Sequence, residues 1–163
     1  MEDKYNDYKM CNKLTEAHVK NLKKTKVSFA AQIFSARFAA AMKMLATHSP
    51  DMPKEAVNTA EFLLFMDKVF DSVNGAKVLP EGGKRLRMAV TSKSEHEQFW
   101  IEAVKVFETV KFIDIKRQPP SIKNWIHTLK GLKYLGNKLN KSGFQFLLWR
   151  TSLDPLGLTA LGI

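Results

Sequence analysis

The stretch NTAEFLLFMDKVFDSVN, residues 58–74, decides how this chain folds. Its apolar residues recur at spacings of three and four: Phe62, Leu63, Phe65, Met66, Val69, Phe70 and Val73. Such spacing places a broad hydrophobic stripe on one side of a helix. The stripe does not account for Asp71 and Asn74, which lie three residues apart, and therefore on one face, just before Gly75 ends the helix. They are either a solvated acid with a helix cap or a polar pair that binds a ligand.

Helical spacing recurs on both sides of this stretch. It predicts a short helix from Thr15, and one at residues 28–48 with Ser28 as N-cap. Ser94 and Glu97 have the spacing of a capping box at the start of a later helix, and Ser121 is expected to cap the next one. The sequence therefore predicts an all-α fold. The apolar run at residues 143–149 fits either a buried helical turn or one short strand near the C-terminus.

The segment at residues 75–93 contains Pro80, Gly82, Gly83 and the basic residues Lys84, Arg85 and Arg87. Such a composition predicts a mobile surface loop.

Length and composition are those of a single globular domain, with 163 residues, 45% hydrophobic and 26% charged. Cys11 is the only cysteine, which excludes an internal disulfide. We expect no signal peptide and no membrane span, because neither an apolar leader nor a run of about 18 apolar residues occurs. The net charge of +10 favours partners that carry phosphate, or serves only solubility.

Familiar catalytic and nucleotide motifs are absent from the sequence. The string closest to a phosphate-binding P-loop, EGGKR at residues 81–85, lacks the first Gly and has Arg85 where Ser or Thr belongs. The strings NKLT at residues 12–15 and NKLN at residues 137–140 lack the Asp of the usual guanine signature. Histidines occur singly, which argues against a zinc site, and no G-x-S-x-G elbow supports a hydrolase triad.

Five strings in order resemble the P element family of THAP-domain DNA transposases, within its helical GTP-binding insertion domain. They are KVSFAAQIFSARFAAAMKML from Lys26, NTAEFLLFMDKVFDSVN from residue 58, FWIEAVKVFETVKFID from Phe99, PPSIKNWIHTLKGL from Pro119 and GFQFLLWRTSLDPLG from Gly143. The resemblance implies an insertion domain at residues 1–149. Residues 150–163 would then be the degenerate start of the C-terminal RNase H-like part.

The same resemblance implies GTP as the cofactor, with or without Mg²⁺, used for assembly with transposon-end DNA rather than hydrolysed for work. Asp71 and Asn74 match the family's guanine contacts, and Phe70 beside them is placed to stack on the base. Other family contacts fall on Lys26, Val27, Ser35 and Asp154, with Lys26 best suited to phosphate. Each of these residues also has an ordinary structural interpretation.

The sequence departs from the family where catalysis is concerned. Related transposases have a metal-binding Glu where this chain has Gly157, and the other family carboxylates precede any segment present here. We therefore expect a noncatalytic, nuclear, GTP-binding fragment whose partners are transposon-end DNA and an RNase H-like domain, with no membrane. A gene fragment, a decayed transposon and a domesticated protein all remain open. The alternative function is a basic helical module that binds DNA or protein without a nucleotide.

Overall fold

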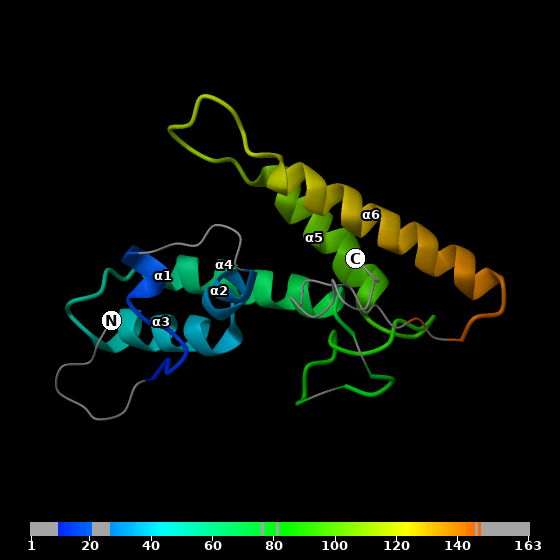
Figure 1. The fold of residues 1–163 in the computed structure, drawn as a ribbon, viewed down its shortest axis with the longest axis horizontal. Helices are drawn as coiled ribbons and strands as arrows, with labels where there is room; N and C mark the ends of the chain where they lie inside the picture. The colour runs from blue at the N-terminus through cyan, green and yellow to red at the C-terminus, as the bar shows by residue number, and fades with distance from the viewer. Residues whose placement is uncertain (1–9, 21–26, 76, 81, 146, 148–163) are drawn as a thin grey trace. The chain divides into compact units, whose positions relative to one another are not determined.

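The structure, a computed structural model, describes residues 10–20, 27–75, 77–80, 82–145 and 147 (Figure 1). Regular structure in these residues is helical, as predicted, and the one recorded β-contact outside the helices is an antiparallel bridge between Val90 and Leu147. The apolar run at residues 143–149 thus contributes a single bridging residue in its described part. The chain divides into two compact units between Phe70 and Asp71.

The first unit contains α1 (Ala17–Lys20), α2 (Val27–Ile33), α3 (Ala36–His48) and most of α4 (Ala56–Ser72). The predicted stripe on α4 is largely confirmed, because Leu63, Met66 and Val69 are buried. Phe62 is the exception, since it is exposed.

A helix four residues long gains little from its own hydrogen bonds, and α1 is held instead by its side chains. His18 stacks on Phe29 with ring centroids 4.2 Å apart, and its Nε2 lies 2.6 Å from Oε1 of Gln32.

Ser35 divides the predicted helix at residues 28–48 into α2 and α3. Its backbone is extended, with φ −128° and ψ 144°. Its hydroxyl donates to the carbonyl of Gln32 at 2.8 Å and accepts from the amide of Phe38 at 3.3 Å. A serine that bonds the backbone on both sides competes with continuous helix and makes a good N-cap. The prediction that Ser28 is the N-cap is therefore wrong, because Ser28 lies inside α2.

The second unit is organised around α5 (His96–Thr109) and α6 (Pro120–Lys141), which lie side by side (Figure 1). Trp100, Ala103 and Phe107 of α5 and Leu129 of α6 are at most 2% exposed. Trp125 of α6 stacks on Phe107, with ring planes 9° apart. The amphipathic patterns that predicted both helices are confirmed, because their apolar positions form this core.

Both predicted caps in the second unit are wrong. The N-cap of α5 is Glu95, which makes no side-chain capping bond. Ser94 does not cap the helix, because its hydroxyl bonds to the backbone of Thr91 and to the ring of His96. The N-cap of α6 is Pro119, with Pro120 in the first turn where a missing N–H costs nothing.

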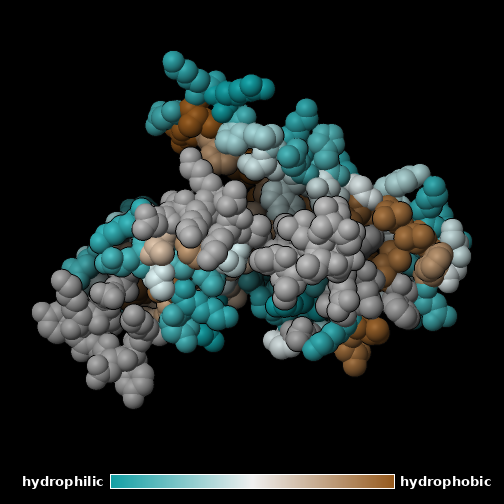
Figure 2. All heavy atoms as spheres, viewed as in Figure 1, coloured by the Kyte–Doolittle hydropathy of each residue, from teal (hydrophilic) through white to brown (hydrophobic). Residues whose placement is uncertain are grey.

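The loop between α5 and α6 carries exposed apolar side chains, and Figure 2 shows hydrophobic surface at this end of the helix pair. Ile113 is 82% exposed. The side chain of Gln118 closes the loop by accepting from the amide of Phe112 and donating to its carbonyl, at 3.0 and 2.8 Å.

Most described residues of the segment after α4 are exposed and none lies in a helix, as its composition predicted, but part of the segment is packed. Leu86, Ala89 and Val90 are buried, and the amide of Ala89 donates to the carbonyl of Lys77 at 2.7 Å. Gly75 permits this path, because a Cβ at that position would lie 2.7 Å from the carbonyl carbon of Met88 and closer still to its oxygen. The close approach of the two backbones turns the chain back toward the end of α4.

Candidate functional site

Asp71, near the C-terminal end of α4, is a nearly buried carboxylate at the head of the second unit. Its side chain is 12% exposed, and its Oδ2 lies 2.7 Å from Nζ of Lys84. Arg87 adds a longer pair, with Nη1 4.0 Å from Oδ1. The predicted alternative of a solvated acid is therefore wrong, because the Asp71 carboxylate is largely removed from water and forms an ion pair with a partly exposed lysine.

Two physical costs explain why basic residues gather at this position. Removing a carboxylate from water is unfavourable unless a cation or hydrogen bonds replace the solvent. The C-terminal end of a helix also carries partial negative charge, which disfavours an acid in the last turn. Lys84 and Arg87 offset both costs, and the path of the chain after Gly75 brings them to Asp71.

The end of α4 is also anchored to α5 by buried polar contacts. The indole Nε1 of Trp100 donates to the hydroxyl of Ser72 at 3.1 Å, and Ser72 is completely buried. His96, also completely buried, places Nε2 2.9 Å from the carbonyl of Leu86 and Nδ1 2.9 Å from the hydroxyl of Ser94. Within the second unit, these bonds fix the last residues of α4 and the segment that carries Lys84.

Burial lowers the pKa of His96 below its ordinary value of 6.5, because a charged imidazole is poorly solvated there. The hydrogen bond to the Leu86 carbonyl and the nearby Glu95 oppose this shift but are smaller. Neutral His96 then donates from Nε2 to Leu86.

Comparison with known families identifies the fold. A family model described as "TNP-like, GTP-binding insertion domain" matches residues 2–86, just over half of the chain. The chain belongs to this family. The matched residues include both Asp71 and Lys84, whereas α5 and α6 lie beyond them. The family resemblance inferred from the five sequence strings is thus confirmed.

The insertion domain also resembles a solved structure titled "Drosophila P element transposase strand transfer complex". The TM-score is 0.74 over 90% of this chain, at 22% sequence identity, and the match covers 33% of the Drosophila chain. This likeness establishes the fold and extends it beyond the family match. The chain spans about a third of the transposase chain that it matches. Comparison with curated proteins finds no match.

The structure brings some of the predicted contact residues of this insertion domain together. Asn74 follows the end of α4, and its backbone N–H donates to the backbone carbonyl of Asp71 at 3.1 Å. In the first unit, Phe70 lies against Phe34, with ring centroids 6.3 Å apart, and Phe34 directly precedes Ser35. Ser35 is already used as the N-cap of α3, so any contact with a nucleotide would compete with that cap.

The remaining predicted contacts are not tested by the geometry. Val27 begins α2, and its side chain is not described. Lys26, Asp154 and Gly157 lie outside the described residues.

Lys84 and Arg87 are the residues that sequence reasoning missed as members of this site. They were recognised only as part of a basic cluster in a loop. Their partner lies 13 or more residues earlier, across a segment without helical or strand periodicity, so no spacing rule connects them. An acid in the last turn of a helix followed by a basic cluster is the one sequence signal that could have suggested the pairing.

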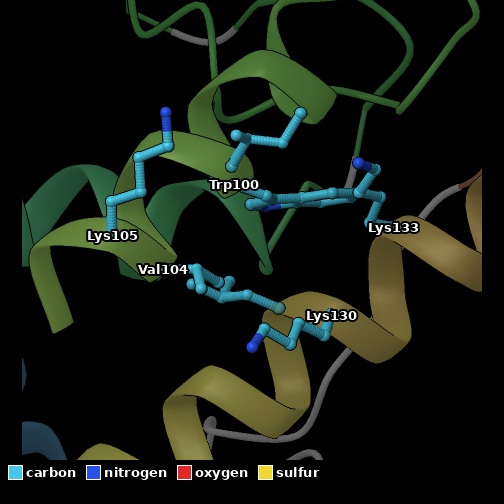
Figure 3. Close-up of a pocket in the computed structure, with 7 residues that line it drawn as sticks. Trp100, Val104, Lys105, Lys130 and Lys133 are labelled. Atoms are coloured by element: carbon cyan, nitrogen blue, oxygen red, sulfur yellow. The ribbon is translucent and has the colours of Figure 1, made fainter. Parts of the chain in front are cut away.

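A shallow groove of about 220 Å³ lies between α5 and α6 (Figure 3). Trp100, Val104 and Leu129 are among its apolar lining residues, and Lys105, Lys130 and Lys133 also line it. Glutamates of α5 pair with two of these lysines: Glu108 with Lys130 at 3.1 Å, and Glu97 with Lys133 at 3.6 Å. Salt bridges at this exposure fasten α5 to α6 only weakly, so the buried aromatic residues carry most of the contact.

Among the residues described, no group of three His, Cys, Asp or Glu side chains is arranged to hold a metal ion. None of the helices in that part of the chain is both long and apolar enough to cross a bilayer.

Proposed function

We propose that this insertion domain binds GTP at the end of α4, with Asp71 as the group that recognises guanine. Family membership supports the nucleotide, and the chemistry of Asp71 supports the position. A carboxylate that is 12% exposed and held by one close cation has strong acceptor oxygens fixed in place. The adjacent N1–H and amino group of guanine match two such oxygens in the bidentate manner of charge-assisted pairs.

The neighbouring residues have supporting roles in this proposal. Phe70 stacks on the base, and Asn74 adds a hydrogen bond beside Asp71. Lys26 binds phosphate, while Val27, Ser35 and Asp154 complete the contacts with the nucleotide, with or without Mg²⁺. Lys84 and Arg87 add positive charge to this part of the domain, which attracts a ligand that carries phosphates.

We further propose that the chain is not catalytic by itself. Gly157 occupies the position of a metal-binding Glu in related transposases, which supports this interpretation. The partners would be an RNase H-like domain of a transposase and transposon-end DNA, in the nucleus. The transposase relative is titled a strand transfer complex, and the net charge of +10 suits a DNA partner.

The direct test is nucleotide-dependent stabilisation of the purified chain. At a GTP concentration about 100 times Kd, binding adds about 2.7 kcal/mol to the free energy of unfolding. We expect GTP, and not ATP, to raise the melting temperature, because adenine presents an amino group but no ring N–H at the corresponding edge. No shift at millimolar GTP in a folded protein would contradict the proposal.

Asp71→Asn provides a sharper test than Asp71→Ala, because it changes hydrogen-bond pattern at nearly constant volume. The asparagine has one acceptor oxygen and one amino donor, so it mismatches the amino group of guanine. Xanthine carries an oxygen in place of that amino group and matches asparagine. We expect Asp71→Asn to lose stabilisation by GTP and gain it from xanthosine triphosphate. Loss of folding alone cannot produce that gain.

A second candidate function rests on α6, which contains five lysines and no acidic residue: Lys123, Lys130, Lys133, Lys138 and Lys141. A helix of this composition can bind the DNA backbone without a nucleotide. That function predicts DNA affinity that falls steeply with salt and does not respond to GTP or to Asp71→Asn. Fluorescence anisotropy with duplex DNA at increasing salt distinguishes the two functions.

A further inference from the structure

The ion pair between Asp71 and Lys84 conflicts with the proposed recognition of guanine. Guanine engages both oxygens of the carboxylate, whereas Nζ of Lys84 already lies 2.7 Å from Oδ2. A fully solvated carboxylate accepts several partners at once, but this side chain is only 12% exposed and leaves little room for approach. The base and Lys84 therefore compete for the same oxygen.

Displacing Lys84 has an energetic consequence. The backbone beside Lys84 is held by the packing of Leu86 and its bond to His96, so it is the side chain of Lys84 that has to move. Once displaced, it loses its closest negative partner and must be compensated by water or by another anion. Guanosine brings no negative charge, whereas GTP brings phosphates on the same molecule. The 36% exposure of the Lys84 side chain gives it freedom to reorient toward them.

We propose that Lys84 couples recognition of the base to recognition of the phosphates. In the free domain it neutralises Asp71, and when Asp71 accepts the guanine edge, Lys84 transfers to a phosphate. Lys84 thus disfavours uncharged guanine compounds and favours the nucleotide. This inference rests on the proposed GTP site at Asp71, and it adds the residue that distinguishes nucleotide from nucleoside.

The test is a two-by-two comparison of wild type and Lys84→Met with guanosine and GTP, using isothermal titration calorimetry. Methionine keeps an unbranched stem and removes the charge. A partly exposed ion pair is worth up to about 1 kcal/mol, or roughly fivefold in affinity. We expect Lys84→Met to bind guanosine about fivefold more tightly. Its affinity for GTP should change little, because the lost contact with phosphate is offset by the contact with Asp71 that no longer has to be broken. The preference for GTP over guanosine then falls roughly fivefold.

Two control variants separate this coupling from general effects of charge and folding. Lys93→Met removes the same charge from an exposed position in the same unit and should leave the preference for GTP unchanged. Lys84→Arg keeps the charge and should retain most of that preference. Melting curves without ligand establish that each variant is folded; if Lys84→Met does not fold, Lys84→Gln replaces it in the comparison.

The outcomes distinguish this inference from the proposed function. If wild type binds GTP and Asp71→Asn switches to xanthosine triphosphate, but removing Lys84 leaves the preference for GTP unchanged, the coupling is wrong and the GTP site stands. If Lys84→Met binds guanosine and wild type does not, competition for Asp71 is supported. If folded wild type and folded Lys84→Met bind no guanine compound, both proposals are wrong.

Discussion

Gly75→Ala is the substitution whose effect is best defined by the geometry. The added Cβ would lie 2.7 Å from the carbonyl carbon of Met88, closer to its oxygen and 3.2 Å from its amide nitrogen, whereas real Cβ atoms essentially never approach closer than 3.0 Å. All three contacts are backbone atoms, so no side chain can rotate away. One of the two segments must move by roughly an ångström, and overpacking of this kind costs about 1–3 kcal/mol or more.

The expected loss is at the upper end of this range, about 3 kcal/mol, because the contact lies between two fixed backbones. In a chain of this size each kcal/mol lowers the melting temperature by roughly 2–4 °C, which predicts a decrease of about 6–12 °C by circular dichroism. Gly131→Ala is the matched control. A Cβ at Gly131 within α6 meets no atom within 4 Å, so alanine should stabilise the helix by about 1 kcal/mol. If Gly75→Ala melts within about 1 °C of wild type, the close approach of the backbones at Gly75 and Met88 is refuted.

Two further predictions concern the buried polar contacts of α5. Ser72→Ala leaves the indole N–H of Trp100 buried without the hydroxyl that accepts its bond. We expect the free energy of unfolding, measured by chemical denaturation, to fall by about 1–3 kcal/mol. An unchanged denaturation midpoint would show that another group accepts this bond. Because the pKa of His96 is lowered on folding, the unfolded chain binds more protons than the folded chain once the pH falls below about 6.5. The contribution of His96 to the free energy of unfolding is therefore fully present above that pH. It is lost as the pH falls toward the pKa of the folded state. The difference between the melting temperatures at about pH 7.5 and about pH 5.5, roughly one unit on either side of the ordinary pKa, should be smaller in His96→Gln than in wild type. The glutamine amide can still donate to the carbonyl of Leu86. An equal difference in the two proteins would exclude His96 as the source of the pH dependence.

The helices of this fold were predictable from the sequence, but their ends were less so. Amphipathic spacing identified α4, α5 and α6 because buried positions recur at every third or fourth residue. Serine at a suspected boundary was a weak guide, since its hydroxyl has several backbone partners available. Ser94 bonds within the turn at residues 91–94, whereas Ser35, inside a continuous helical pattern, forms the cap that divides α2 from α3.

Of the residues at the candidate site, those on the helix could be predicted from the sequence, whereas those from the following segment could not. Asp71 and Asn74 stood out because three-residue spacing placed them together at a helix end. Lys84 did not, because its position depends on the close approach of Gly75 and Met88 and on burial of Leu86. These are contacts between segments that share no repeating pattern. Composition alone predicted a mobile surface loop, and most described residues of this segment are exposed, but Leu86, Ala89 and Val90 are buried.

The part of the chain that carries the site depends on a part that lies outside the family match. Residues 2–86 include Asp71 and Lys84, yet Ser72 is anchored by Trp100 and Leu86 by His96, both from α5. A chain truncated after residue 86 keeps every matched residue but loses both anchors. We expect it to lose stabilisation by GTP, because nothing would then hold Lys84 against Asp71 or keep the end of α4 packed. GTP-dependent stabilisation of that truncated chain, measured beside the full chain, would show that α5 has no part in forming the site.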